Sequence, residues 1–150
     1  MKLVVQRVSH ASVTVDGNVV GKINEGLMIL IGAKKGDTEK DVEYCVEKAI
    51  NLRIFTDEND KMNLSVMDID GEALVISNFT LLANYAHGNR PDYMSAAKPA
   101  EADRLYCFFC DILAGKLKSV EMGVFGADMA VELSNDGPVT IVMDSKILVK

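Results

Sequence analysis

Alternating apolar and polar residues predict most of the strands in this chain. Residues 2–15 alternate well enough for a strand with one buried face. Asp16-Gly17-Asn18 predicts a hairpin turn into a second strand over residues 19–23. Residues 27–33 are nearly all apolar, which favours a central strand buried on both faces. Another core strand is expected over residues 72–79.

Two segments show helical spacing instead. In the first, Thr38 followed by Asp41 is typical of a capped helix start, and the predicted buried face holds Val42, Cys45, Val46, Ala49 and Ile50. In the second, Pro99 fits the first turn and Gly115 the end, with a predicted buried stripe of Ala102, Leu105, Tyr106, Phe109, Ile112 and Leu113. Between these helices, residues 84–99 form the longest irregular stretch, which we expect at the rim of a site.

Strands resume near Val120, Met129 and Val139, so strands outnumber helices and separate the two helices from each other. This order favours an α+β fold with two helices packed on sheet. A chain of 150 residues without repeats or linkers predicts a single domain, residues 1–150.

Composition limits the class of protein. Hydrophobic residues make up 49% of the chain and charged residues 25%, which is ordinary for a globular domain. Because no apolar run resembles a signal peptide or a membrane span, we expect a cytoplasmic protein without a membrane partner. Three cysteines are too few and too odd in number for a disulfide framework, and they indicate reduced thiols.

Several possible metal or catalytic motifs have little support. Cys107 and Cys110 form a C-x-x-C pair, but it falls in mid-helix among aromatic residues and no second Cys/His pair could complete a zinc site. We therefore expect both to be buried structural thiols. His10 and His87 are the only histidines, and neither lies in a G-x-S-x-G or H-E-x-x-H motif. No metal and no cofactor is predicted.

The most informative segment is Asn135-Asp136-Gly137-Pro138-Val139-Thr140, which lies between the alternating runs 129–133 and 139–143. Asn-Asp-Gly ordinarily predicts a hairpin turn. A proline after the glycine removes a ladder donor, and it makes a cis peptide bond cost only about 0.5–1 kcal/mol. A rigid Gly-Pro kink at strand ends aims its carbonyls in a fixed direction, which favours recognition through the backbone.

A second segment, Ser77-Asn78-Phe79-Thr80, ends the core strand over residues 72–79. Together with the Gly-Pro segment, it resembles the D-aminoacyl-tRNA deacylase (D-tyrosyl-tRNA deacylase) family. The similarity extends from about Val5 to Val142 and includes Gln6-Arg7-Val8, Ala11-Ser12-Val13-Thr14-Val15, Arg53-Ile54-Phe55, Lys61-Met62-Asn63-Leu64 and Phe125-Gly126-Ala127-Asp128-Met129. In the family motif Ser-Gln-x-Thr, glutamine occupies the position of Asn78, whose side chain is one methylene shorter.

The resemblance implies a β/β/α layered fold with predominantly antiparallel or mixed sheets, two helices and a homodimer with its sites at the interface. It implies hydrolysis of D-aminoacyl-tRNA, and of glycyl-tRNA mischarged on tRNA-Ala, with attack by water assisted by the ribose 2′-hydroxyl. Ser77, Phe79 and Thr80 would hold the ester through backbone N–H groups and the Thr80 hydroxyl. A cis Gly137-Pro138 pair would enter the partner's pocket and reject L-aminoacyl-tRNA.

The remaining residues have supporting roles in this interpretation. Asn78 contacts substrate, and Phe125 and Met129 are either core residues or pocket walls. Arg7 is either an exposed strand residue or a support that holds the Gly137-Pro138 carbonyls. The formal charge of −6 predicts a small RNA footprint limited to the aminoacyl-tRNA 3′ end, with basic residues beside the pocket.

Three alternatives stay open at this point. Thr80 could be a nucleophile, although the sequence suggests no base to activate it. The protein could be a related editing deacylase with relaxed chirality, an alternative that the Asn78 departure keeps in view. It could also be a non-catalytic dimer that binds the end of an RNA.

Overall fold

The structure is a computed structural model that describes residues 1–148. Its strands are β1 (Lys2–Val15), β2 (Asn18–Ile23), β3 (Gly26–Gly32), β4 (Phe55–Thr56), β5 (Met62–Leu64), β6 (Glu72–Ser77), β7 (Val120–Met122) and β8 (Ala130–Asp144). Its helices are α1 (Glu39–Asn51), the 3-10 helix η1 (Phe79–Leu82), α2 (Pro99–Ala114) and the short α3 (Ser145–Leu148). Both long helices and all the core strands predicted from periodicity are therefore present.

One mixed sheet organises the fold, with the strand order β2-β1-β3-β6-β7 and with β8 also paired to β1. The long strand β1 pairs antiparallel with β3 through residues 2–8 and with β2 through residues 11–15, while β8 follows its other edge. Strands β3, β6 and β7 are parallel to one another. Their carboxyl ends consequently meet at one end of the sheet.

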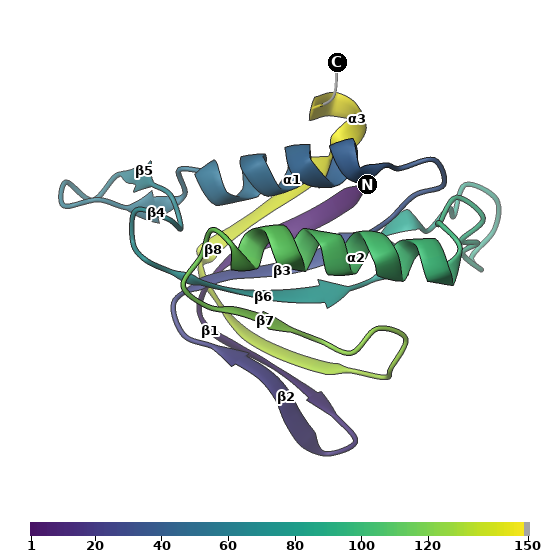
Figure 1. Cartoon of the computed structure of the whole chain (residues 1–150), viewed down its shortest axis with the longest axis horizontal. Helices are drawn as coiled ribbons and strands as arrows, with labels where there is room; N and C mark the ends of the chain where they lie inside the picture. Colours follow the sequence, from purple (N-terminus) through teal and green to yellow (C-terminus); the bar gives the residue numbers. More distant parts are fainter. Residues whose placement is uncertain (149–150) are drawn as a thin grey trace.

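The fold has three layers. Helices α1 and α2 lie side by side over one face of the sheet, and β2 with the distal half of β1 bends away on the other side (Figure 1). Strand β2 returns over β6 and β7 so closely that a Cβ at Gly21 would lie 3.0 Å from the Met122 carbonyl oxygen. A small apolar core, which includes Val13, Ile23 and Leu74, fills the space between these sheet layers. The predicted β/β/α layered α+β fold is confirmed.

The predicted features of the helices are largely confirmed. The Thr38 N–H donates to Asp41 Oδ2 at 2.8 Å, as part of a capping box at the start of α1. One prediction for α2 is wrong: Cys110 is buried, but Cys107 is exposed. Cys107 lies four positions after Asp103, so both are on the polar side of the helix. The distance between Cys107 Sγ and Asp103 Oδ1 is 3.7 Å. Burial raises the pKa of the Cys110 thiol to about 12.

A buried ion pair fixes the start of β1 to the end of β8 and to α1. The α-amino group of Met1 is fully buried and lies 2.7 Å from Asp37 Oδ2. It also donates to Ser145 Oγ at 2.8 Å, and that hydroxyl donates to Asp41 Oδ1 at 2.7 Å. A buried charge requires such partners, because desolvation costs several kcal/mol per ion.

None of the helices within residues 1–148 has the length and apolar character that crossing a membrane requires.

Candidate functional site

A cavity of about 820 Å³ opens at the carboxyl ends of β3, β6 and β7. Its walls are mainly apolar and include Leu30, Ile76 and Tyr106. Its polar side is the Ser77-Asn78-Phe79-Thr80 segment, where β6 ends and η1 begins. Ligands commonly bind beyond the carboxyl ends of parallel strands, because the chain leaves the sheet there in loops. The sequence-predicted segment thus lies at the expected end of the sheet.

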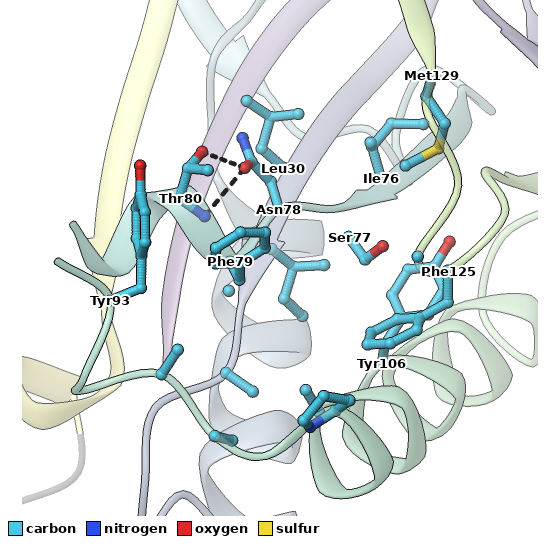
Figure 2. Close-up of a pocket in the computed structure, with 18 of the residues that line it drawn as sticks. Leu30, Ile76, Ser77, Asn78, Phe79, Thr80, Tyr93, Tyr106, Phe125 and Met129 are labelled. Atoms are coloured by element: carbon cyan, nitrogen blue, oxygen red, sulfur yellow. Dashed lines mark hydrogen bonds between the residues drawn. The ribbon is translucent and has the colours of Figure 1, made fainter. Parts of the chain in front are cut away.

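Asn78 holds this segment in its turn. The Asn78 N–H donates to the Ile31 carbonyl oxygen at 2.8 Å, which ties the turn to β3. The Asn78 side-chain oxygen accepts hydrogen bonds from the Thr80 N–H, at 3.2 Å, and from the Thr80 hydroxyl (Figure 2). This is an Asx turn, which asparagine forms because its short side chain reaches the backbone two residues on. The proton of the Thr80 hydroxyl is therefore directed at Asn78.

Phe79 supplies the free donor of the turn. As the first residue of η1 it has no partner for its N–H within the helix. No acceptor for this N–H is found elsewhere among residues 1–148. The Phe79 ring is 56% exposed and packs edge-on against Tyr93, with 4.9 Å between ring centroids. The Phe79 N–H is thus the backbone donor of the turn left available to a ligand.

The opposite wall carries Phe125 and Met129. Figure 2 shows Ser77 between this wall and the Phe79–Tyr93 pair. Phe125 lies 6.2 Å from Tyr106, measured between ring centroids, and Met129 packs against the core that includes Ile76. Tyr106 is buried and donates its hydroxyl to the Val75 carbonyl oxygen at 2.9 Å. Phe125 and Met129 therefore line the cavity and also cover the core, which combines the two placements considered for them.

The Gly137-Pro138 segment forms a bulge in β8. Both halves of β8 pair with β1, so the two alternating runs around this segment are not joined by a hairpin. Between the pairs Val8–Asn135 and Gln6–Thr140, Arg7 alone faces residues 136–139. The Gly137-Pro138 bond is cis, and Gly137 has φ +136°.

Arg7 on β1 contacts the bulge through its side chain. Its side chain is 11% exposed, which excludes the exposed strand residue considered above. Its Nε donates to the Asp136 carbonyl oxygen at 2.9 Å, and its Nη1 donates to the Ile54 carbonyl oxygen at 2.7 Å. Arg7 therefore contacts the Gly137-Pro138 segment through the carbonyl of Asp136, the residue directly before the pair. Neither Arg7 nor the Gly-Pro pair lines the cavity of its own chain.

Known proteins place the chain in a family. The model of the D-Tyr-tRNA(Tyr) deacylase family matches residues 4–144. Proteins named D-aminoacyl-tRNA deacylase from Caldicellulosiruptor saccharolyticus and Clostridium beijerinckii are 56% and 55% identical to it, each covering 97% of this chain and 98% of its own length. The chain belongs to this deacylase family. The resemblance deduced from dispersed segments is confirmed.

Solved structures share the fold of this chain. A structure titled c-Myc DNA Unwinding Element Binding Protein has a TM-score of 0.91 and 42% identity, with 96% of this chain and 98% of that chain covered. A probable eukaryotic D-amino acid tRNA deacylase has a TM-score of 0.79 at 14% identity, over 95% of this chain and 97% of that one. The second likeness shows the fold alone.

The cavity contains few ionisable groups. Asp128 is the charged residue among the described lining residues. His10 is exposed on β1, His87 is exposed in the loop before α2, and neither lines the cavity. No group of three His, Cys, Asp or Glu side chains that could hold a metal ion occurs in residues 1–148. A base for Thr80 is therefore not supplied by a histidine at this site.

Two residues of the candidate site were missed from the sequence. Tyr93 comes from the irregular loop that was expected at a rim, but nothing in the loop singled it out. Gly32 ends β3, and a Cβ there would lie 2.8 Å from the Asn78 carbonyl oxygen. The signal for Gly32 was a glycine at the end of an apolar core strand, which often marks a close approach of two backbones.

Proposed function

We propose that this chain hydrolyses the ester bond of D-aminoacyl-tRNA and releases a free D-amino acid and tRNA. The observation that carries the proposal is the free Phe79 N–H in a turn that opens on a cavity at the ends of three parallel strands. An ester carbonyl placed there receives a preorganised donor where negative charge develops. One such donor contributes about 3–4 kcal/mol to an oxyanionic transition state. Membership of the deacylase family supplies the reaction class, and a tRNA substrate supports a cytoplasmic location.

In the proposed reaction, water attacks the ester carbonyl carbon and its oxygen becomes an oxyanion held by the Phe79 N–H. A proton of the water passes to the ribose 2′-hydroxyl oxygen, and the 2′-hydroxyl gives its own proton to the 3′-oxygen. The oxyanion then reforms the carbonyl of the free amino acid as the carbon–oxygen bond to the 3′-oxygen breaks. The 3′-oxygen ends as a hydroxyl, so the protons balance without an oxidant or metal. Ser77 holds the ester beside Phe79, whereas Thr80 offers only its hydroxyl oxygen as an acceptor, because both of its donors bind Asn78 Oδ1. Thr80 acts as a hydrogen-bonding residue, because its proton is directed at Asn78.

Chirality would be read by the Gly137-Pro138 bulge of a second copy in a homodimer. The bulge is exposed on its own chain and does not line its own cavity, so a second copy is needed to bring it to a site. Arg7 holds the carbonyl before it, and Gly137 has no side chain to keep the backbone away from a ligand. A backbone wall beside the substrate Cα excludes an L side chain whatever its size. Glycine carries no side chain, so glycyl-tRNA mischarged on tRNA-Ala is a proposed second substrate.

Matched D- and L-tyrosyl-tRNA test this function. We expect rapid deacylation of the D ester and little of the L ester, and similar rates on both would refute the chirality wall. Release of a small L-amino acid would instead favour an editing deacylase with relaxed chirality. Stable binding of D-tyrosyl-tRNA without release of tyrosine would favour a non-catalytic binder.

A glycine pair separates the wall from general stability. Gly137→Ala places a Cβ 2.8 Å from Val139 Cγ2 at a φ of +136°, so the bulge must shift. Gly17→Ala removes another positive-φ glycine, in the β1–β2 turn, where a Cβ meets nothing within 4 Å. Both variants should lose about 1 kcal/mol or more of stability. Only Gly137→Ala should lower the ratio of D to L cleavage, and an equal change in both variants would contradict the proposed role of the bulge.

A further inference from the structure

A second, smaller hollow of about 350 Å³ lies directly beside the cavity. Three segments each contribute residues to both hollows. After β3, Ala33 lines the cavity and Lys34 the smaller hollow; before α2, Ala96 lines the cavity and Ser95 the smaller hollow. In η1, Thr80 lines the cavity while Leu82 lines the smaller hollow. Since consecutive Cα atoms are about 3.8 Å apart, the smaller hollow is the adjoining space outside the site.

The smaller hollow is basic in an acidic chain. Its charged residues within the described structure are Lys2 and Lys34, although the chain has a formal charge of −6. The nearby Lys146 lowers the pKa of Lys34, and this effect outweighs the opposite effect of the Asp144 and Asp37 carboxylates. None of these three ammonium groups has a carboxylate within 4.0 Å in residues 1–148, whereas Lys116 pairs with Glu47 at 3.9 Å. Like charges gathered without anionic partners are stabilised by a bound anion.

The neighbouring acidic groups already have other partners. Asp37 Oδ2 binds the Met1 amine at 2.7 Å and accepts from the Lys34 backbone N–H at 2.6 Å. Asp144 Oδ1 accepts from the Lys146 backbone N–H at 3.0 Å. These bonds direct both carboxylates towards the backbone, and the lysine side chains stay available to a ligand.

The hollow also offers an aromatic surface. Tyr85 lines it and is 74% exposed, an unusual exposure for a tyrosine without a partner ring in the described structure. Its loop, between η1 and α2, reaches the end of the sheet where β1 begins (Figure 1). Lysines beside an exposed aromatic ring are the combination that binds single-stranded nucleic acid, through phosphates and stacked bases.

We infer that this hollow, with Lys2, Lys34 and Tyr85, binds the phosphodiester strand that leads into the site, one or two nucleotides before the esterified end. The inference rests on the proposed function, because it needs an RNA whose 3′ end occupies the cavity. It assigns the local positive charge to single-stranded RNA. Contact with one or two phosphates also fits the acidic total, which disfavours a long duplex footprint.

Two substrates test the inference on the whole enzyme: D-tyrosyl-tRNA and D-tyrosyl-adenosine, which has the same ester but no phosphate. The Lys2→Ala/Lys34→Ala double variant should raise KM for D-tyrosyl-tRNA about tenfold at low salt. Its slope of log KM against log salt should fall by about 0.7 for each phosphate that the variant no longer binds. Its kcat/KM for D-tyrosyl-adenosine should stay at the wild-type value, which also shows that the variant folds.

Lys22→Ala is the matched control, since Lys22 is exposed on β2 and has no carboxylate within 4.0 Å among the described residues. It pairs with Ser12, ten residues farther along β1 than Lys2. This control should leave both substrates unchanged. An equal effect of Lys22→Ala and the double variant would overturn the inference, as would an unchanged KM for tRNA in the double variant.

Two other outcomes separate failure of this inference from failure of the proposed function. A parallel loss on both substrates would assign the lysines to a free anion or to the fold, and it would overturn the RNA assignment. Failure of the wild-type enzyme to cleave either ester would refute the proposed function itself.

Tyr85 provides an independent test. Tyr85→Ala should raise KM for the tRNA about fivefold or more because the base no longer stacks, and Tyr85→Phe should restore the wild-type KM. Equal KM values for the two Tyr85 variants would contradict the stacking role.

Discussion

Replacing Gly32 with alanine should displace the turn that carries the Phe79 N–H. Gly32 is the last residue of β3, and the Asn78 carbonyl lies against it. A Cβ at this position would be 2.8 Å from that carbonyl oxygen and 2.5 Å from Leu82 Cδ2. The Leu82 methyl can rotate away at small cost. The Asn78 carbonyl belongs to the backbone of the turn, so relief of that contact requires the turn to move.

The size of the movement sets the expected effects. Ordinary van der Waals contact begins near 3.4 Å, so the turn must retreat by about 0.6 Å. Overpacking of this kind costs about 1–3 kcal/mol, which lowers Tm by about 3–10 °C in a chain of this length. A misplacement of about 1 Å in a site reduces rates about a hundredfold. We therefore expect kcat for D-tyrosyl-tRNA to fall about tenfold in Gly32→Ala.

Gly115→Ala is the matched control for this substitution. Gly115 follows α2 with a φ of −77°, and its nearest contact for a Cβ would be the Ile112 carbonyl oxygen at an ordinary 3.4 Å. It should therefore melt and deacylate as the wild type does. Single-turnover deacylation and thermal unfolding measure both variants. Wild-type kcat and Tm in Gly32→Ala would refute the claim that this contact positions the turn.

The same reasoning makes three other predictions. Thr80→Ala should keep its single-turnover rate within about tenfold of wild type, because one polar side chain is removed while the backbone donor stays; a loss of several thousandfold would make Thr80 the nucleophile. Asn78→Ala removes a cap worth about 1 kcal/mol and should lower Tm by about 4 °C. Asn78→Asp keeps the acceptor and should melt as wild type, so equal melts of the two variants would contradict the Asx turn. Burial opposes the ionisation of Asp41, but hydrogen bonds from Ser145 and Thr38 outweigh it and lower its pKa. A lowered pKa stabilises the fold above the ordinary value of about 3.9, and this stabilisation is lost as pH falls through the folded pKa. Asp41→Asn should therefore unfold at lower urea than wild type at pH 7, with the gap closing toward pH 2; a gap independent of pH would contradict this.

Local periodicity was sufficient for the long helices, for the core strands and for most of their buried faces. Residues 27–33 were expected to be buried on both faces because they are apolar without alternation, and consecutive residues of β3 are indeed buried. The start of α1 followed from Thr38 and Asp41, which interact over one turn. Such features depend on contacts between near neighbours in the chain, and the residue types alone determine them.

The arrangement of the site depended on contacts that no local pattern contains. Arg7 binds the carbonyls of Ile54 and Asp136, which are 47 and 129 residues away. Its partners are fixed by the register of β8 on β1, and a shift of one residue would turn its side chain to the other face. The Asx turn at Asn78 is different, because its three atoms lie within three residues. An asparagine two residues before a threonine is enough to predict this turn, whereas the resemblance to the family motif implied that Asn78 contacts substrate.

Under the proposed function, the separation of the turn from the bulge would let one site accept many side chains and still select by handedness. The apolar walls around Phe125 and Met129 distinguish substrates by size, and a methylene changes binding there by only about 1–3 kcal/mol. The Phe79 donor would act on the ester carbonyl, which is the same in every substrate. A backbone wall at Gly137 would act on the direction in which the side chain leaves the Cα, which is independent of its size. Because these elements address different atoms, damage to the turn should appear in kcat for both enantiomers, and damage to the bulge should appear in their ratio. A change of both quantities in constant proportion would mean that a single element performs the two tasks.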